Sequence, residues 1–447
     1  MAGKYQEYPE YIDSGVTWLG SVPEHWVPIR FKHRLFEKKK TLNSELEAGS
    51  ISFGRVIYKN SENLAPETKA SYQEVLTEEF LINPLNMNYD LLSLRTALSE
   101  IDVVVSTGYI VIRSDDRMVQ RYVRWLLQEF DVAHMKTLGS GVRQTINYMD
   151  IGNSFFYEPT KNEQQKIANF LDHETAKIDI LIEKQQQLIK LLKEKRQAVI
   201  SHAVTKGLNP NAPMRDSGVE WLGEVPEHWA MPKIAHISRV LNGSTPDKTN
   251  LSYWEDGTIP WLASGCLNSE VVDVPSEFIT KNAYQNSSVE LIPANSLLVG
   301  MVGQGKTRGT SAILAIDSCI NQNMAAIVLD GKIQTRFLYY TLQAMYDDLR
   351  ELGRGGNQAA LNCEIIGSVR VPLPPNDEQI AIVDMLDELV SKLSNTDELG
   401  FGQITLLQER RTALISASVT GKIDVRSWQA PEKARSYSTK PMSRACV

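Results

Sequence analysis

The chain has 447 residues, of which 42% are hydrophobic and 23% charged, and its formal net charge is −7. This length predicts two to four domains, and the composition is typical of a soluble globular protein, which excludes a fibrous or wholly disordered chain. No apolar run approaches the ~20 residues that span a bilayer and the first thirty residues contain no apolar leader segment, so we expect a cytoplasmic protein without a membrane segment. The acidic balance also argues against a protein that coats nucleic acid without sequence preference.

A fourteen-residue segment near the start of the chain returns near its middle. Residues 13–26 read DSGVTWLGSVPEHW and residues 216–229 read DSGVEWLGEVPEHW, with twelve of fourteen positions identical. Glu24 beside His25 could act as an acid and a base, but no nucleophile, metal-ligand set or nucleotide site accompanies the pair in either half. We therefore expect this tryptophan box to be structural, with aromatic side chains that fix each domain to a helical core. The tryptophans concerned are Trp18, Trp26, Trp221 and Trp229.

Two variable regions, roughly 27–140 and 230–355, show mixed α/β patterns. Apolar runs predict strands at 101–113, 295–303 and 323–330, and helical spacing predicts helices at 117–130 and 334–352. The fold class is therefore α+β, that is, mixed α/β. The four cysteines show no zinc-ligand spacing and are interpreted as small buried side chains or bystanders. They are Cys266, Cys319, Cys363 and Cys446.

A second internal similarity shows that each half of the chain has the same layout. At an offset of 215, residues 141–167 align with 356–382, and the alignment continues without a gap to 195–207 over 410–422. Each half runs from tryptophan box to variable region, Pro-containing connector and long helix. One duplication of about 210 residues predicts a pseudo-two-fold molecule rather than a short-period repeat array.

The long helices are the clearest local prediction. From Asn162 to about Thr205 the chain contains no Pro or Gly and repeats apolar residues every three or four positions, which predicts a helix of roughly 60 Å. The second copy contains Gly400 and Gly402, each costing about 1 kcal/mol in a helix interior, so a kink or short loop is expected there. We expect the two helices to pack as an antiparallel coiled coil; the alternative is that each packs only on its own domain. The predicted interface comprises Ile167, Leu171, Ile178, Leu181, Leu188, Leu192, Val199, Ile382, Leu386, Leu389, Leu393, Leu407 and Leu414.

These patterns predict that the chain consists of five segments. The segments are a first domain (1–155), a central long helix (156–207), a second domain (208–370), a distal long helix (371–422) and a disordered tail (423–447).

One sequence motif suggests a nucleotide-binding site. GMVGQGKT at 300–307 matches the phosphate-binding pattern G-x-x-x-x-G-K-[ST]. Its chemistry requires a helix that begins at the Lys-Thr step, whereas Gly309 and strand-forming residues follow, and only about 16 residues separate the motif from 323–330. We interpret it as a Gly-rich basic β-turn, with a P-loop NTPase as the alternative function and a coiled-coil scaffold protein as a further one.

Several motifs together resemble the specificity subunit of type I restriction-modification systems. They are the duplicated tryptophan box, LNGSTPDKTNLSYWEDGTIPWLASG (241–265), VPLPPNDEQIAI (371–382) and KEKRQAVISHAVTKGL (193–208). The resemblance covers nearly the whole chain except the tail. It implies a non-catalytic reader whose two target-recognition domains each contact one half of an asymmetric, bipartite, gapped sequence in double-stranded DNA. It also implies that the helices set the spacing of the two half-sites and dock two methyltransferase subunits, with restriction-translocase subunits completing the complex.

The same resemblance places the cofactors in the partners: S-adenosylmethionine, ATP and Mg²⁺ are expected there, and no cofactor or metal is expected in this chain. Base edges are read mostly by Arg, Lys, Asn and Gln, and phosphates are met by Lys, Arg, Ser, Thr and backbone amides. On that rule the candidate DNA contacts are Gln304, Lys306, Arg308, Ser244, Thr245, Arg95, Arg143, Gln144, Arg354, Asn357 and Gln358.

Overall fold

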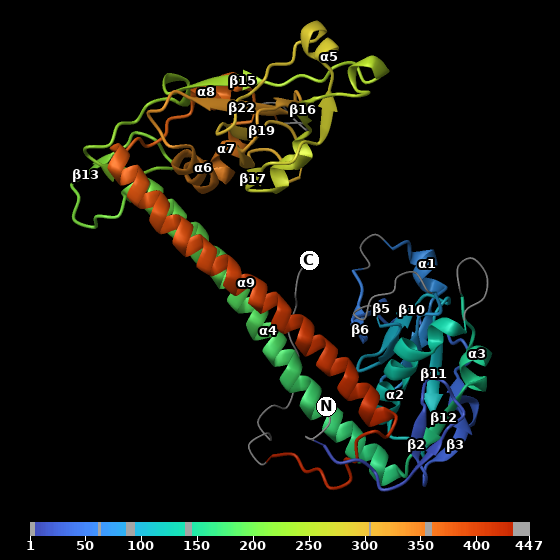
Figure 1. Cartoon of the computed structure of the whole chain (residues 1–447). Coiled ribbons are helices and arrows are strands. Elements are labelled where there is room, and N and C mark those ends of the chain that lie inside the picture. The colour runs from blue at the N-terminus through green and yellow to red at the C-terminus, as the bar shows by residue number, and fades with distance from the viewer. Residues whose placement is uncertain are drawn as a thin grey trace. The chain divides into compact units, whose positions relative to one another are not determined.

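The chain forms two compact units, each of which joins a β-rich domain to parts of both long helices (Figure 1). The computed structural model describes residues 5–60, 64–85, 94–138, 145–303, 305–353 and 360–431. One unit consists of Met1–Gln185 with Gly402–Val447, and the other of Gln186–Phe401. The predicted mixed α+β class is confirmed. The units do not follow linear segment boundaries, because each long helix is shared between them.

The first unit is built on a six-stranded, mostly antiparallel sheet in the order β4-β11-β8-β9-β6-β5. Its strands are β4 (Leu35–Glu37), β11 (Ile110–Ser114), β8 (Phe80–Ile82), β9 (Thr96–Leu98), β6 (Arg55–Tyr58) and β5 (Gly49–Ser52). Three two-stranded ladders surround it: β1 (Tyr11–Asp13) with β2 (Ser21–Pro23), β3 (Val27–Arg30) with β12 (Phe155–Glu158), and β7 (Gln73–Val75) with β10 (Val103–Val105). The helices of this domain are α1 (Pro66–Ala70), α2 (Gln120–Ala133) and α3 (Tyr148–Asn153).

Aromatic burial holds the first domain to the helical core. The predicted helix at 117–130 forms as α2, which packs against β9 and buries Trp125 and Phe130. These side chains belong to one apolar cluster with Ile167 of one long helix and Leu414 of the other. The domain and both helices of this unit therefore share a single hydrophobic core.

The second unit contains a five-stranded sheet, in the order β15-β22-β19-β20-β17, and a separate three-stranded sheet, in the order β18-β16-β21. The strands are β15 (Ser238–Asn242), β22 (Met324–Leu329), β19 (Leu297–Gly300), β20 (Ser311–Leu314), β17 (Val271–Val272), β18 (Glu277–Ile279), β16 (Ile259–Leu262) and β21 (Cys319–Ile320). A short ladder pairs β13 (Met214–Asp216) with β14 (Glu224–Pro226), and the helices are α5 (Lys281–Asn286), α6 (Thr335–Ala344), α7 (Tyr346–Glu351) and α8 (Cys363–Ser368). The helix predicted as continuous at 334–352 is interrupted at Met345, which is buried and has φ −98° and ψ 20°.

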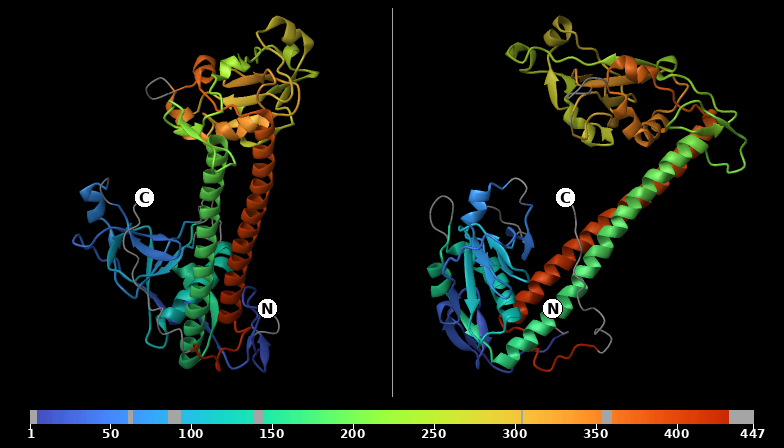
Figure 2. Two further views of the ribbon diagram at one scale, coloured as in Figure 1. Left: turned by 90° about the vertical axis from the view of Figure 1, so that its left-hand side faces the viewer. Right: turned by 180° about the vertical axis from the view of Figure 1, so that it is seen from behind.

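The two long helices are α4 (Lys161–Lys206) and α9 (Asn376–Val419), and Figure 2 shows them side by side. Their pairing is antiparallel, as predicted: in the first unit Arg411 Nε donates to Asp179 Oδ1 at 3.0 Å, and Gln185 Nε2 donates to Gln403 Oε1 at 2.6 Å. As the residue number rises along α4, its partner's number falls along α9. Each helix also packs on a β-rich domain, but the contacts between α4 and α9 exclude the alternative that each helix packs only on its own domain.

The expected kink at Gly400 and Gly402 is wrong, because α9 runs through both residues without interruption. Gly400 is buried, and a Cβ added there would lie 3.1 Å from Ile189 Cγ1 in the second unit. The missing side chain therefore lets α4 and α9 approach closely at this level.

Two predicted interface residues, Leu181 and Leu188, lie on the surface, with exposed fractions of 48% and 45%. The inward-facing positions of α4 follow alternating steps of four and three residues and include two polar residues. They are Ile178, Ile182, Gln185, Ile189, Leu192, Arg196 and Val199. The two leucines each precede an inward-facing isoleucine by one residue, and successive helical residues point about 100° apart. The other predicted interface residues are buried or half-buried.

The start of the predicted tail is packed rather than extended from the domain. Ile423 and Val425 are 5% and 1% exposed and belong to the apolar cluster of the first unit. Trp428 meets Phe170 edge to face, with ring centroids 5.5 Å apart. The remaining tail positions, 432–447, lie outside the described residues.

Candidate nucleic-acid interface

The histidine of each tryptophan box contacts the first turn of a long helix. His25 Nε2 lies 2.7 Å from Glu163 Oε1 on α4, and His228 Nε2 lies 2.6 Å from Glu378 Oε1 on α9. The glutamate next in sequence, Glu24 in the first box, is not the hydrogen-bond partner. The duplicated Glu-His step is therefore part of a domain-to-helix contact rather than an acid-base pair.

The second tryptophan of each box is buried beside a residue that follows the other long helix. Trp26 and Trp229 are 2% and 1% exposed, and Trp229 Nε1 donates to Glu378 Oε2 at 2.9 Å. A Cβ on Gly421, just after α9, would lie 3.1 Å from Trp26 Cη2, and one on Gly207, just after α4, would lie 3.1 Å from Trp229 Cζ2. Each box thus joins the N-terminal end of one long helix to the C-terminal end of the other.

The first tryptophans of the boxes, Trp18 and Trp221, are half-buried and pack against the apolar clusters of the first and second units. Trp18 lies edge to face on Phe130 of α2, with ring centroids 5.6 Å apart. All four box tryptophans therefore contribute to the attachment of a domain to the helices.

A buried glutamine in each long helix binds the start of a domain helix. Gln164 Oε1 accepts a hydrogen bond from Val119 N at 2.9 Å, just before α2, and Gln379 Oε1 accepts one from Gln334 N at 2.8 Å, just before α6. Both glutamines are 1% exposed. The two glutamines align at the 215 offset, and the same offset relates their two partners, but the sequence alone does not reveal this role.

A second repeated contact uses one aspartate on each long helix. Arg121 Nη1 binds Asp172 Oδ2 at 2.8 Å, and Arg336 Nε binds Asp387 Oδ1 at 2.6 Å. An aromatic residue one turn further along α2 or α6 also donates to each carboxylate; these donors are Trp125 Nε1 and the Tyr340 hydroxyl. All three pairs are related by 215 residues, so extending the internal alignment into 117–130 would have found them.

The G-x-x-x-x-G-K-T run connects two strands and does not begin a helix. Gly300 ends β19, and the chain then turns back into β20, which pairs with β19 antiparallel from Ser311. A P-loop needs a helix N-terminus at the Lys-Thr step, so the structure removes the support for the NTPase alternative and agrees with the Gly-rich turn. Gln304 lies outside the described residues.

Short helix α7 holds this connection in place from one side. Arg350 Nη1 donates to the carbonyl oxygens of Gly305, at 2.9 Å, and Arg308, at 2.7 Å. The Tyr346 hydroxyl donates to the carbonyl oxygen of Lys306 at 2.8 Å. The Lys306 side chain is exposed and that of Arg308 is half-buried. These two candidate contacts therefore stand on a loop whose backbone is fixed.

The GSTP loop is a second ordered connection in the same domain. Trp261 Nε1 donates to the Ser244 carbonyl oxygen at 3.1 Å, and the Thr245 hydroxyl donates to Gln322 Oε1. Gly243 is required by close packing, since a Cβ there would lie 2.4 Å from the Ile320 carbonyl oxygen. Ser244 and Thr245 are both half-buried. Their backbone or hydroxyl groups are thus already engaged in holding the loop.

Arg95 does not occupy a position suited to reading DNA. It is 8% exposed, and its Nε donates to Asp131 Oδ1 at 2.7 Å while its backbone N donates to Oδ2 at 2.6 Å. Burial raises the pKa of Asp131, although the contacts with Arg95 oppose that rise. The sequence shows an arginine but not its burial, and the structure assigns it to the domain interior.

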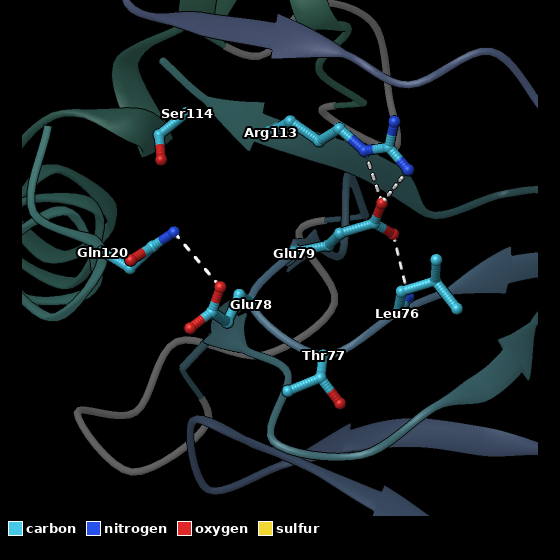
Figure 3. Close-up of a pocket in the computed structure, with 7 residues that line it drawn as sticks. All are labelled: Leu76, Thr77, Glu78, Glu79, Arg113, Ser114 and Gln120. Carbon is cyan, nitrogen blue, oxygen red and sulfur yellow. Dashed lines mark hydrogen bonds and ion pairs between the residues drawn. The ribbon is translucent and has the colours of Figure 1, made fainter. Parts of the chain in front are cut away.

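A polar hollow of about 240 Å³ lies beside β8 and β11 in the first domain (Figure 3). Figure 3 shows Arg113 directed at Glu79, and Arg113 Nε lies 2.5 Å from Glu79 Oε1. The other carboxylate oxygen of Glu79 accepts from Lys38 Nζ at 2.9 Å and from Leu76 N at 2.8 Å. The lining residues are Leu76, Thr77, Glu78, Glu79, Arg113, Ser114 and Gln120. The buried carboxylate is therefore already saturated by donors from the chain itself.

Comparison with known proteins identifies a family match across the second domain. A profile of the type I restriction modification DNA specificity domain matches residues 226–399. The EcoR124I/EcoR124II specificity subunit of Escherichia coli is 28% identical over 158 residues, covering 35% of this chain and 39% of that protein. The putative MjaX specificity subunit of Methanocaldococcus jannaschii is 22% identical over 275 residues, covering 60% of this chain and 59% of that one.

Solved structures extend the likeness over nearly the whole fold. A chain solved in work on complex assembly and conformational transition of the type I R-M system has a TM-score of 0.69 at 13% identity and covers 90% of this chain and 99% of its own length. The HsdS subunit from Thermoanaerobacter tengcongensis has a TM-score of 0.52 at 14% identity, with coverage of 90% and 98%.

Residues 226–399 belong to the type I restriction modification DNA specificity domain family. The resemblance read from the tryptophan boxes and the GSTP region is thereby confirmed. The chain matches less than two thirds of the length of the first curated relatives, 39% and 42% of the first two.

Several candidate DNA contacts lie outside the described residues. Those positions are Arg143, Gln144, Arg354, Asn357 and Gln358, in addition to Gln304. They stay predictions from the sequence alone.

In the described part of the chain, no group of three or more His, Cys, Asp and Glu side chains is arranged to hold a metal ion. Burial raises the pKa of the Cys266 and Cys319 thiols to about 11, which keeps both protonated at neutral pH. Within the same residues, none of the helices combines the length and apolarity needed to cross a membrane.

Proposed function

We propose that this chain is the DNA-recognition subunit of a type I restriction-modification complex and reads an asymmetric, gapped target through its two β-rich domains. The proposal rests on one observation: the two β-rich domains are attached to the long helices by the same contacts, but the domains themselves differ. Repeated contacts at Gln164 and Gln379 attach the domains in the same way, whereas the sheets differ, with six strands in one domain and five plus three in the other. Different readers on one frame select different half-sites.

The repeated frame also supports docking of two copies of one partner. Leu191 on α4 and Leu406 on α9 are related by the 215 offset, and they are 61% and 66% exposed although they lie in helices that bury other apolar residues. This pair places one of its two leucines in each unit, which matches two methyltransferase subunits, one for each half. Restriction-translocase subunits would join through these partners, which would also carry S-adenosylmethionine, ATP and Mg²⁺, leaving recognition as the role of this chain.

Sequencing the methylated positions in random DNA exposed to the chain and its methyltransferase tests the recognition role. We expect methylation at a motif of two unlike half-sites separated by a fixed gap. A palindromic motif would contradict two unlike readers. Methylation or binding without sequence preference would instead support a scaffold that binds proteins only.

The docking proposal is tested by native mass spectrometry of the complex. Leu191→Asp and Leu406→Asp should each reduce the number of bound methyltransferase subunits from two to one, and the double variant should bind none. Leu251→Asp is a matched control, because Leu251 is 63% exposed and lies in the second β-rich domain. Retention of two subunits by the double variant would exclude these leucines from the docking surface.

A further inference from the structure

The loop between β19 and β20 has an inner and an outer side. The carbonyl oxygens of Gly305, Lys306 and Arg308 all accept hydrogen bonds from α7. In a trans peptide the C=O and the following N–H point in opposite directions. The amides of Lys306 and Thr307, which follow the first two of these carbonyls, therefore point away from α7.

Arg350 is the central donor of this arrangement. Its Nη1 binds two of the loop carbonyls and also lies 3.1 Å from the Tyr346 hydroxyl, which binds the third. Its side chain fills the space beside Gly309, where φ is +83° and a Cβ would lie 2.9 Å from Arg350 Cγ. One guanidinium thus fixes the loop at both Gly305 and Arg308.

The outer side of the loop carries the chemistry of a phosphate contact. The Lys306 side chain is exposed, and Gly305 beside it is also exposed and has no side chain to shield the backbone. Lysine ammonium groups and backbone amides are the usual partners of DNA phosphate oxygens. A loop held from behind presents both groups without the cost of ordering the backbone when DNA binds.

We propose that Arg350 is a positioning residue that holds this loop so that Lys306 contacts a phosphate of the DNA in the second half-site. The inference rests on the proposed recognition role and adds to it a residue that does not itself touch DNA. A phosphate contact carries no sequence information, so its loss should weaken binding to all targets alike and leave the preference among bases unchanged.

The test measures affinity for the selected target duplex over a range of salt concentrations, using the full chain and its variants. Lys306→Ala should weaken binding several-fold and reduce the slope of log affinity against log salt by about 0.9, the value for one lost phosphate contact. Arg350→Met should reproduce both changes. The double variant should show no further change in slope, because both substitutions remove the same contact.

Controls separate positioning from charge and from folding. Arg370→Ala removes a positive charge that likewise binds a backbone carbonyl, that of Met231 at 2.8 Å, and should leave the slope unchanged. Tyr346→Phe removes the hydroxyl that binds the Lys306 carbonyl and Arg350 Nη1 but keeps the two bonds from Arg350 to the loop. It should cause a smaller change in the same direction, which keeps the test usable if Arg350→Met misfolds. Thermal unfolding of each variant identifies a folding defect.

Three outcomes would overturn the inference. An unchanged slope in folded Arg350→Met would show that the loop needs no support from this side chain, and additive slopes in the double variant would show that Arg350 meets DNA directly. An equal change in Arg370→Ala would show a general effect of charge. If the unaltered chain selects no target at all, the recognition role itself fails, which is a separate result.

Discussion

His25 and His228 perform the same task in two domains through carboxylates that are far away in sequence. Burial raises the pKa of Glu163, but hydrogen bonds from His25 and Thr160 outweigh that effect and leave the pKa below its ordinary value. The Thr160 hydroxyl lies 2.8 Å from Glu163 Oε2. The charged form of Glu163 is therefore favoured in the folded protein and contributes to stability.

Replacing this carboxylate should have an effect that depends on pH. Because the folded pKa of Glu163 is lowered, its stabilising effect is present above the unfolded value of about 4.3 and is lost as pH falls through the folded value. Glu163→Gln should therefore lower the unfolding temperature at pH 7, and its difference from the unaltered chain should shrink toward pH 3. Calorimetry across that range measures it.

The equivalent substitution Glu378→Gln provides the comparison. The side chain of Glu378 is 39% exposed against 5% for Glu163, so solvent screening should make its effect at pH 7 smaller. A Glu163→Gln difference that stays constant from pH 7 to pH 3 would contradict a role for the ionised carboxylate.

For single residues, the sequence identifies important positions more reliably than it identifies the contacts those residues make. Duplication drew attention to Trp229 and His228, but the partner that joins them, Glu378, lies about 150 residues away and no local pattern reveals it. Arg95 shows the opposite error: its residue type suits DNA, yet its ion pair with Asp131 is buried. Burial depends on the fold, so the residue type alone does not reveal it.

Among elements, the long helices show what periodicity can and cannot predict. The expected span from Asn162 to Thr205 differs from α4 by one residue at each end, because a long run without Pro or Gly leaves little alternative. The side of α4 that faces inward is less predictable from the sequence. Gln185 lies among the inward-facing positions because it pairs with Gln403, whereas an apolar-only reading favours the exposed Leu188.

Gly400 and Gly402 provide a matched pair for testing helix packing. Gly402 is exposed and a Cβ there would meet no atom within 4 Å, so Gly402→Ala should stabilise α9 by about 1 kcal/mol through helix propensity alone. Gly400→Ala should stabilise less, because its Cβ would press on Ile189 at 3.1 Å. Chemical denaturation measures both differences, and an equal gain at the two positions would contradict close packing at Gly400.

For the whole molecule, each compact unit is assembled from separate parts of the chain. The first unit needs Leu414 and Val419 from α9, which share its apolar cluster with Trp26. The second needs Ile200 and Val204 from α4, which share another cluster with Trp229. The repeat predicts two similar halves, but it does not predict that each half completes the other's core. That exchange depends on the antiparallel return of α9 along α4.

A chain cut after Gly207 should therefore stay together. We expect fragments 1–207 and 208–447, produced in the same cells with a tag on one, to copurify and elute as one species, because separation would strip each unit of buried helix residues. Leu414 is 1% exposed, so Leu414→Asp in the second fragment should weaken the association by placing a charge in the first unit's core. Two fragments that purify separately, each with a cooperative unfolding transition, would instead show that each domain is complete without the exchanged helix.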